Sequence, residues 1–412
     1  MSKTASRLDR FLLSTLRKML GPAPLDLALP DCREPDSNLR PSVATIRFAD
    51  RQTLIRVLRN PEMGFGDGFT DGDITIEGDF VSALEVIYET RRTRPGRRGL
   101  LSRWLLWAQR NTLNGSRRNI RRHYDLGNDF YKLWLDDEMQ YTCAYFPDER
   151  AELEQAQLAK LDHVCRKIWL QAGETVVEAG CGWGGLALHM ARNYGVNVKA
   201  FNISHEQIAY ARERARREGL SNQVEFVEDD YRNIRGRFDA FISVGMLEHV
   251  GLEHYLELGN VIRRAIGGSG RGLLHFIGRN FDRPLSLWIK RRIFPGGHPP
   301  ALRSVMDIFE PQDFAVLDVE NLRMHYARTL EYWLERFERS YEQVQSQYGP
   351  QFARMWRLYL AGSIAGFRTG TMQLFQVVFA GPQCKTIPWN RAYLYEGAEP
   401  RQSDEPWIRA IS

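Results

Sequence analysis

The sequence has little cysteine: its 412 residues contain five, and no two of them are separated by only two residues. A scattered, odd-numbered set excludes a disulfide scaffold and a zinc ribbon, and it is typical of a reducing cytoplasm. The chain also lacks an uncharged run of the roughly 18 apolar residues that a membrane-spanning helix requires. Its N-terminus lacks the apolar core and cleavage site of a signal peptide. We therefore expect a cytoplasmic protein without a bound metal ion.

A strong excess of one sign of charge is also absent, because 56 Lys and Arg residues balance 51 Asp and Glu residues. The small excess is concentrated in two segments. Residues 91–122 contain eleven arginines and no acid around the apolar run 104–107 (WLLW), and residues 1–20 carry five basic residues and one acid. Basic segments mixed with large apolar side chains attract an anionic membrane surface. We expect both segments to bind such a surface, although a solvated linker would explain a single basic run equally well.

The composition, 43% hydrophobic and 26% charged, is that of a globular protein, and the length predicts two or three domains. Residues 1–90 form a small mixed α/β domain, and the basic linker 91–122 follows it. Prolines and aspartates indicate a further linker over 21–41, and the glycines between 64 and 72 indicate a turn-rich stretch. The apolar spacing predicts helices over 7–20, 52–59 and 80–90 and a strand over 43–48.

Strands and helices alternate from about residue 150, which predicts a parallel sheet covered by helices on both faces. The expected strands are 175–179, 196–203, 224–227, 238–244 and 272–277, and the expected helices are 152–170, 186–194, 205–218 and 253–266. Helices over 330–347 and 351–366 then precede a last strand of the same sheet, 373–380. The second domain covers 123–395, and 396–412 is a C-terminal tail.

A glycine cluster follows the first of these strands. Residues 178–185 read EAGCGWGG, so that Glu178 precedes Gly180, Gly182 and Gly184. Glycines at a helix start allow backbone amides to approach a ligand closely. Dinucleotide-binding loops are also rich in glycine. An acid followed by Gly-x-Gly-x-Gly, however, is typical of methyltransferases that bind S-adenosylmethionine (SAM). Because SAM carries an amino group and no pyrophosphate, we expect Glu178 to face that cation or to orient the loop.

Polar residues follow the next two predicted strands. Asn202 and Gln207 lie near the end of the second strand, and Asp230 and Tyr231 follow the third. Ligands of open α/β sheets bind at the carboxyl ends of the strands. Asp230 could accept a hydrogen bond from the adenine amino group and Tyr231 could stack, while the other two could reach the ribose or the amino-acid part. Each residue alone would also fit an ordinary cap or turn.

Six colinear segments between about residue 120 and residue 380 resemble the signature of cyclopropane-fatty-acyl-phospholipid synthases and of the similar mycolic acid cyclopropane synthases. The segments are 123–131 (HYDLGNDFY), 139–145 (MQYTCAY), 178–185, 244–251 (VGMLEHVG), 274–278 (LHFIG) and 373–379 (QLFQVVF). The resemblance implies an α/β fold of the class I SAM-methyltransferase type. This fold is a Rossmann-like sheet with helical insertions, here combined with the small mixed α/β N-terminal domain.

The resemblance also implies an activity: methylation of the cis double bond of an unsaturated acyl chain in a membrane phospholipid, followed by loss of a proton and closure to a cyclopropane. SAM is the methyl donor, and in this family the base is a bound bicarbonate. The bicarbonate ligands map onto Cys143, Glu248, His275, Ile277 and Tyr326. The SAM contacts map onto Tyr141, Thr142, Gly180, Gly182, Asn202, Gln207, Asp230 and Tyr231. The sequence departs from the usual pattern by Glu178 in place of Asp, Asn202 in place of Thr and Ser363 in place of a Cys.

Other functions remain open at this point. A related enzyme could yield a methylene- or methyl-branched chain, and a non-catalytic regulator could bind SAM or lipid. The complete bicarbonate set disfavours a regulator, and the absence of an Asn/Asp-Pro-Pro-Tyr/Phe motif disfavours a nucleic-acid methyltransferase. We therefore expect a lipid partner, no nucleic acid, and a position at the inner face of the membrane. The chain length, the head group and the choice between monomer and homodimer are left open.

Overall fold

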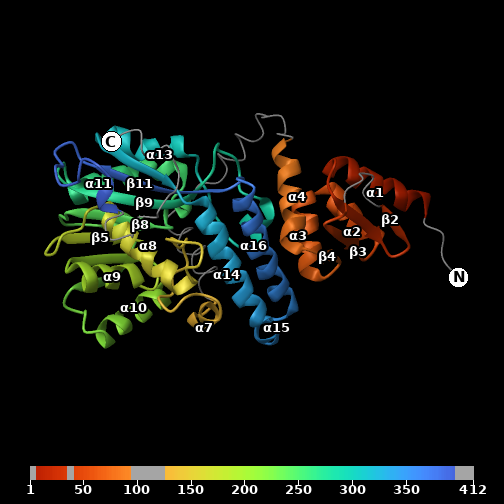
Figure 1. Ribbon diagram of the computed structural model, residues 1–412, viewed down its shortest axis with the longest axis horizontal. Helices are drawn as coiled ribbons and strands as arrows, with labels where there is room; N and C mark the ends of the chain where they lie inside the picture. Colours follow the sequence, from red (N-terminus) through yellow and green to blue (C-terminus); the bar gives the residue numbers. More distant parts are fainter. Residues whose placement is uncertain (1–5, 35–40, 94–125, 395–412) are drawn as a thin grey trace, which may run out of the picture.

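The computed structural model describes residues 6–34, 41–93 and 126–394. They form a small N-terminal unit around a four-stranded sheet and a larger unit around a seven-stranded sheet, with helices α14 and α16 between the two sheets (Figure 1). The predicted basic linker, from residue 94 on, and the predicted tail at 396–412 lie outside the described residues. Within the described ranges, no helix is both long and apolar enough to cross a bilayer.

The N-terminal unit combines its sheet with four described helices. The strand order is β2-β1-β3-β4, with β1 parallel to β3 and the other two pairs antiparallel. The elements are α1 (Arg7–Leu20), β1 (Leu25–Leu29), β2 (Cys32–Glu34), β3 (Ala44–Phe48), α2 (Arg51–Arg59), α3 (Pro61–Asp71), β4 (Ile74–Gly78) and α4 (Phe80–Thr93). The predicted helices over 7–20, 52–59 and 80–90 and the predicted strand over 43–48 are confirmed.

The prediction of a linker over 21–41 is wrong, because β1 and β2 occupy part of it. Every residue of β1 is buried, and Leu25 and Leu27 pair in register with Ala44 and Ile46 of β3. Prolines and aspartates on both sides suggested a loop. Pairing with a strand more than ten residues away, which the local pattern does not report, makes the segment extended.

The glycine-rich stretch after Pro61 is helix α3 and not the predicted series of turns. Asn60 caps the helix with its side chain, and Pro61 lies in the first turn. An added side chain at Gly64 would lie 2.5 Å from the backbone of α2, and one at Gly66 would lie 2.3 Å from the Trp288 ring. Close packing on both sides therefore outweighs the low helix propensity of glycine.

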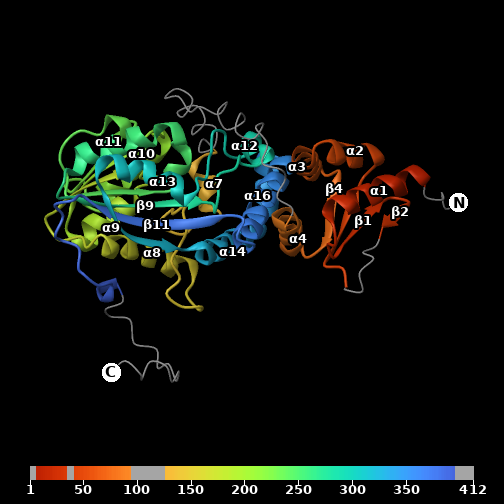
Figure 2. The ribbon, with the colours of Figure 1, turned by 90° about the horizontal axis from the view of Figure 1, so that it is seen from above.

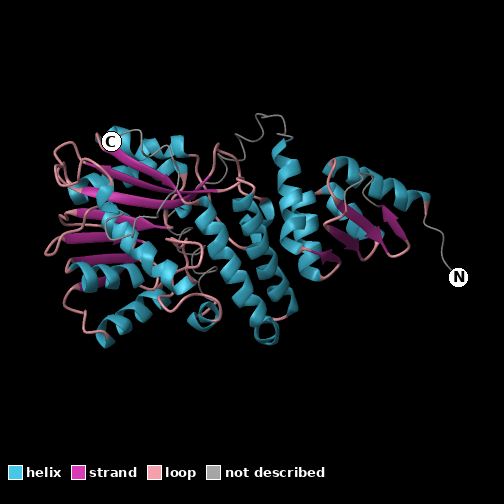
Figure 3. Ribbon diagram, viewed as in Figure 1, coloured by secondary structure: helices cyan, strands magenta, loops and turns pink. Residues whose placement is uncertain are grey.

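The larger sheet has the order β10-β11-β9-β8-β5-β6-β7. Helices α8 and α9 cover one face and α11 and α13 the other (Figure 2), and Figure 3 shows the strands between these helices. The elements are α7 (Asn128–Lys132), α8 (Leu153–Lys167), β5 (Thr175–Ala179), α9 (Gly185–Tyr194), β6 (Asn197–Asn202), α10 (His205–Arg217), β7 (Val224–Glu228), β8 (Ala240–Val244), α11 (Tyr255–Ile266), β9 (Arg271–Gly278), α12 (Leu287–Arg292), α13 (Leu302–Phe309), β10 (Ala315–Asn321), α14 (Arg323–Arg339), α15 (Tyr341–Tyr348), α16 (Pro350–Arg368) and β11 (Gln373–Ala380).

The prediction of a parallel sheet holds for β9, β8, β5, β6 and β7 but is wrong at the other edge. Strand β11 is antiparallel to both of its neighbours, β9 and β10. It inserts between them after the helices α14–α16, so its direction is not set by a single crossover helix. Strand β10 was not predicted, because it is largely exposed and has no buried alternation.

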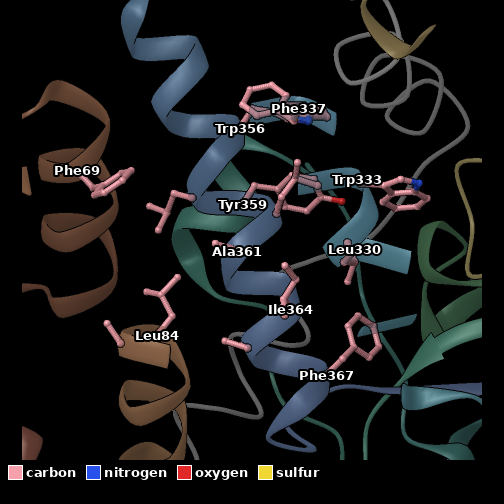
Figure 4. Close-up of a cluster of buried hydrophobic side chains, with 14 of the residues drawn as sticks. Phe69, Leu84, Leu330, Trp333, Phe337, Trp356, Tyr359, Ala361, Ile364 and Phe367 are labelled. Atoms are coloured by element: carbon pink, nitrogen blue, oxygen red, sulfur yellow. The ribbon is translucent and has the colours of Figure 1, made fainter. Parts of the chain in front are cut away.

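Helices α14 and α16 join the two units. The predicted helix over 330–347 begins earlier, at Arg323, and is interrupted at Ser340 between α14 and α15. Figure 4 shows Phe69 and Leu84 of the N-terminal unit on one side of α16 and Trp333 of α14 on the other. These side chains belong to one continuous buried cluster, so the N-terminal unit shares a core with the helical insertion of the larger unit.

Candidate functional site

The glycine loop lines a cavity of about 130 Å³ at the carboxyl ends of β5, β6, β7 and β8, here called the glycine-loop cavity. Nine of the ten residues predicted to contact SAM line it: Tyr141, Thr142, Glu178, Gly180, Gly182, Asn202, Gln207, Asp230 and Tyr231. The exception is Gly184, where φ is +83° and an added Cβ would lie 2.6 Å from the Phe226 ring. Gly184 thus permits the packing of the loop against β7 rather than contact with a ligand.

The loop exposes its backbone to this cavity. The amides of Gly180 and Cys181 both donate to the carbonyl oxygen of Phe201, at 2.8 and 3.1 Å, which ties the loop to β6. Gly182 has a φ of +54°, and apart from its two chain neighbours no described residue has a heavy atom within 4 Å of a Cβ added there. Since a side chain would occupy that space, glycine at 182 leaves room for a ligand against the backbone.

Glu178 is a buried carboxyl group in the same cavity. Its Oε2 atom has no hydrogen-bond partner in the part of the chain that the structure describes. Burial raises the pKa of Glu178 to about 8, although the ammonium of Lys160 opposes the shift. A buried, unpaired carboxylate is unfavourable until an opposite charge approaches it. The cavity therefore fits a ligand with a cationic amino group, as SAM has.

The other polar residues predicted to contact SAM differ in whether they already form hydrogen bonds within the protein. The amide nitrogen Nδ2 of Asn202 donates to Gln207 Oε1 at 2.7 Å and to Gly182 O at 3.2 Å, so these two side chains support the loop. Asp230 accepts from the backbone of Arg232 at 3.0 Å. The buried hydroxyl of Tyr231 has no partner among the described residues, so it is open to a ligand.

Two residues of α8 hold the segment 140–142 in place, and sequence reasoning missed both. Lys160 is fully buried, and its Nζ donates to Gln140 Oε1 at 2.5 Å and to Thr142 Oγ1 at 2.9 Å. Gln157 donates from Nε2 to the carbonyl oxygen of Thr142 at 2.9 Å. Since Tyr141 and Thr142 line the cavity, α8 determines part of its wall. A lysine in an otherwise amphipathic helix is not unusual, so the sequence did not indicate that Lys160 supports the cavity wall.

A second cavity, of about 260 Å³, lies beside the first and is here called the aromatic cavity. All five residues predicted to hold bicarbonate line it: Cys143, Glu248, His275, Ile277 and Tyr326. Its aromatic lining comprises Tyr88, Tyr141, Phe294, Tyr326, Tyr359 and Phe367. Ring faces are electron-rich and stabilise a nearby positive charge without reacting with it. The cavity thus combines a few buried polar groups with an apolar, aromatic wall.

Glu248 lies in the short 3-10 helix η2 (Leu247–His249), which follows β8. Its Oε1 accepts a hydrogen bond of 2.5 Å from the backbone amide of Ile277, so two of the predicted bicarbonate ligands contact each other. Its Oε2 is buried and has no partner in the described ranges. Burial raises the pKa of Glu248 to about 7. Near neutral pH this carboxyl can therefore share a proton with a second acid.

His275 on β9 faces the same cavity with its orientation fixed by Gln376, directly opposite on β11. The Gln376 Nε2 atom lies 3.1 Å from His275 Nδ1. With the Gln376 amide in this orientation, its nitrogen donates and Nδ1 accepts, which places the proton of the neutral ring on Nε2. Burial lowers the pKa of His275 well below its usual value, and Nε2 has no partner among the described residues. The pair therefore presents one N–H donor that a small anion would fit.

Tyr326 and Cys143 complete the predicted set. Tyr326 lies in the first turn of α14, not before the helix as predicted, and its ring centroid is 4.6 Å from that of Phe367. Cys143 is fully buried, and burial raises the pKa of its thiol well above the usual value. A thiol without access to its ionised form is a poor nucleophile. We therefore expect that Cys143 does not act as a covalent nucleophile.

The two cavities meet at four residues that line both: Tyr141, Thr142, Gly245 and His249. Gly245 has a φ of +77°, and an added Cβ would lie 3.0 Å from the methyl group of Thr142. Only a glycine therefore leaves the space between the cavities. Sequence reasoning missed Gly245 and His249 as site residues, although both lie in the segment 244–251. The arrangement suits transfer of a small group from a polar ligand to an apolar one.

Comparison with protein families gives a match over residues 111–377, more than half of the chain, to the family described as mycolic acid cyclopropane synthetase. The chain is 35% identical over 396 residues to a probable fatty acid methyltransferase of Pseudomonas putida. That alignment covers 90% of this chain and 96% of the relative.

Two further similar proteins are named as cyclopropane synthases. The cyclopropane-fatty-acyl-phospholipid synthase of Escherichia coli is 37% identical over 344 residues, which is 82% of this chain and 88% of that one. The mycolic acid cyclopropane synthase CmaA1, solved in complex with S-adenosylhomocysteine (SAH) and CTAB, aligns with a TM-score of 0.61 and 28% identity over 64% of this chain and 97% of that one. These similarities agree with the predicted family and fold.

Proposed function

The chain belongs to the mycolic acid cyclopropane synthetase family and is a SAM-dependent methyltransferase, and from this we propose that it converts the cis double bond of an unsaturated phospholipid acyl chain into a cyclopropane. The observation that carries the proposal is the junction of the two cavities at Thr142, Gly245 and His249. A polar site for the methyl donor opens there onto an aromatic site for the hydrocarbon.

The glycine-loop cavity has the task of binding and orienting the methyl donor. When bound, SAM supplies an electrophilic methyl group on a positively charged sulfur. Glu178 would pair with its amino group, the backbone at Gly182 would lie against it, and Tyr231 would donate its free hydroxyl. A methyl group held near Thr142 and Gly245 would face the aromatic cavity, where an alkene could approach in line with the C–S bond.

In the proposed reaction, the aromatic cavity would stabilise the positive charge on the acyl chain and hold the acceptor of one proton. Methyl transfer would break the C–S bond, form a C–C bond and leave a cation on the acyl chain. The ring faces of Tyr141, Tyr326 and Phe367 would stabilise this cation while excluding water. Loss of a proton from the added methyl group then lets the ring close. His275, Glu248 and Tyr326 would hold bicarbonate, which supplies a proton acceptor when bound.

A methyl- or methylene-branched product is the alternative. The similarity to a probable fatty acid methyltransferase over 90% of the chain favours it. Both reactions begin with the same methyl transfer. For a methylene branch, a hydride shift would move the cation to the carbon that carries the new methyl group, and the proton would then leave without ring closure; a saturated methyl branch would also require a reductant. The same cavities would therefore serve both.

Lipid extracts from cells with and without the expressed protein test the proposal. We expect an acyl chain heavier by one CH2 unit. A methylene-branched chain has the same mass as a cyclopropane, so NMR must separate them: cyclopropane protons resonate at unusually high field, and vinylidene protons do not. Vinylidene signals alone would establish the methylene-branched alternative, and an unchanged lipid profile would refute both.

Gln376→Leu is expected to slow turnover about tenfold while leaving SAH binding unchanged. The substitution removes the donor that fixes the proton of His275 on Nε2, and loss of one buried partner costs roughly 1–3 kcal/mol. Turnover and calorimetric SAH binding measure the two effects. Gln373→Leu is the matched control, since Gln373 lies on the same strand, bonds to Asn321 and lines neither described cavity of the site. Equal losses in both variants would contradict a role for the tautomer.

We also propose that the protein is cytoplasmic and binds an anionic membrane through residues 1–20 and 91–122. Helix α1 supports this, because Leu8, Phe11 and Met19 are exposed on it beside basic residues. Near a charged surface each Lys or Arg contributes about 1 kcal/mol, and salt screens the attraction. Sedimentation with phosphatidylglycerol vesicles should weaken steeply as salt is added. Equal binding to neutral phosphatidylcholine vesicles at every salt concentration would contradict the electrostatic part.

A further inference from the structure

A third cavity, of about 350 Å³, lies between the N-terminal unit and the helices α12 and α16, and is here called the N-terminal cavity. Its wall is mainly apolar, with side chains from α1, β3, α2, α3 and α4 on one side and from α12 and α16 on the other. Leu16, Phe48, Ile87 and Leu358 are typical members. None of the residues of the predicted methyl-donor or bicarbonate sets lines it.

The N-terminal cavity adjoins the aromatic cavity. Five residues line both: Glu62, Tyr88, Ser286, Ile289 and Gly362. The described chain thus contains three adjoining spaces, from the glycine loop through the aromatic cavity to the N-terminal unit. The middle space is the one in which the double bond would react, so the third space is positioned to receive what extends beyond it.

We propose that the N-terminal cavity binds a hydrocarbon segment of the lipid substrate while another part of that lipid reacts in the aromatic cavity. This inference rests on the proposed function. An acyl chain is long, flexible and apolar, so transfer of its CH2 groups from water into an apolar cavity is favourable. Two sources supply the same chemistry: the methyl end of the reacting chain, and the second acyl chain of the same lipid.

The region of shared lining residues, here called the passage, lies where contacts fix α12 and α16 to the N-terminal unit. Glu62 Oε2 accepts from the backbone amide of Leu287 at 2.7 Å, at the start of α12. The Arg292 guanidinium makes two hydrogen bonds of 3.0 Å to the carboxylate of Asp67. Glu85 of α4 accepts from Arg368 of α16 at 2.9 Å. These contacts tie α12 and α16 to α3 and α4, four helices whose side chains line the cavity, so its shape is built into the fold.

Gly362 offers a direct way to narrow the passage. It lies on α16 and lines both cavities, and the nearest atom to an added Cβ is the hydroxyl oxygen of Tyr88 at 3.9 Å. Its backbone is ordinary right-handed helix, so a side chain is tolerated there. A leucine would extend into the passage instead of into packed protein. Alanine at the same position adds one methyl group and is the matched control.

The experiment compares Gly362→Leu, Gly362→Ala and the wild-type protein on a set of lipids. The reacting chain keeps its double bond at one distance from the carboxyl end and is either full length or truncated beyond the double bond. Each chain is presented as a diacyl phospholipid and as a lysophospholipid. SAH affinity and melting temperature are measured for every variant.

We expect Gly362→Leu to lose at least about tenfold in kcat/KM on the full-length diacyl lipid and Gly362→Ala to lose much less. Recovery on truncated chains would assign the cavity to the methyl end. Recovery on the lysophospholipid would assign it to the second acyl chain. An equal loss on every lipid, or none on any, with SAH affinity unchanged, would overturn the inference.

A binding measurement decides the question where Gly362→Leu does not fold or the wild-type protein is inactive. The probe is a diacyl phospholipid with a photoreactive diazirine at the end of a chain. Labelling of wild-type peptides that contain Leu16 or Ile87 would support the inference. Labelling confined to the larger unit would overturn it. Wild-type inactivity on all acyl lipids would refute the proposed function separately, because the labelling does not depend on turnover.

Discussion

Tyr326→Phe should slow product formation by about ten- to a hundred-fold, and His275→Ala should slow it at least as much, while SAH binding stays near the wild-type value. Both side chains line the aromatic cavity, and His275 has an unpaired Nε2 within the described chain. If they hold an anion there, each removal takes one hydrogen bond from a buried charge, which costs roughly 1–3 kcal/mol. Turnover in the presence of bicarbonate, measured against its concentration, provides the test.

The control for the tyrosine is Tyr332→Phe. Tyr332 lies on the same helix, and its hydroxyl donates to the carbonyl oxygen of Ala151 at 3.3 Å, away from the cavity. If Tyr326→Phe and Tyr332→Phe had the same small effect, Tyr326 would only pack against Phe367. A Tyr326→Phe variant whose dependence on bicarbonate is unchanged would contradict the assignment of the anion to this site.

Glu178→Gln should weaken SAH binding at pH 8 by at least about 2 kcal/mol, or roughly thirtyfold in Kd, and should remove most of its pH dependence. In the unbound protein the pKa of Glu178 is about 8, raised by burial, so below pH 8 most molecules carry a neutral carboxyl group. A cationic amino group binds the ionised form better. Wild-type affinity should therefore rise with pH from 6 to 8, by up to tenfold per unit, and then level off.

Calorimetric titrations between pH 6 and pH 9 measure this dependence directly. Glu225→Gln is the control, because Glu225 lies on β7, is exposed, and pairs with Lys199 at 3.0 Å outside the cavity. That variant should follow the wild-type curve. If Glu178→Gln also followed it with parallel slope, the carboxyl group would orient the loop and not face the amino group.

Site residues could be predicted from the sequence where they lie at, or soon after, the carboxyl end of a predicted strand. Glu178 lies at the carboxyl end of β5, and Gly182 and Tyr231 follow β5 and β7. Because the carboxyl ends of parallel strands converge on one edge of a sheet, their meeting could be expected. Glu248 and His275 were placed by resemblance, since an isolated acid and an isolated histidine are common in ordinary cores. Both lie in the aromatic cavity.

What could not be predicted depends on contacts between distant segments. Gln376 meets His275 across 101 residues only because β11 inserts next to β9, and nothing local in the pattern reports that register. Lys160 is buried only because α8 packs against the segment 140–142. The glycines of α3 look like turns until Trp288 and α2 are placed against them. In each case tertiary packing outweighed the local preference.

The position of β11 in the sheet also means that the proposed active site is completed only late in the synthesis of the chain. Until the last strand leaves the ribosome, β9 and β10 have no neighbour between them, and two unpaired strand edges are prone to aggregate. The same strand delivers Gln376, so His275 has no partner at Nδ1 before that moment. A nascent chain therefore completes its glycine loop almost two hundred residues before Gln376, the residue that orients His275. Strand β11 therefore completes both the sheet and the hydrogen bonding of His275.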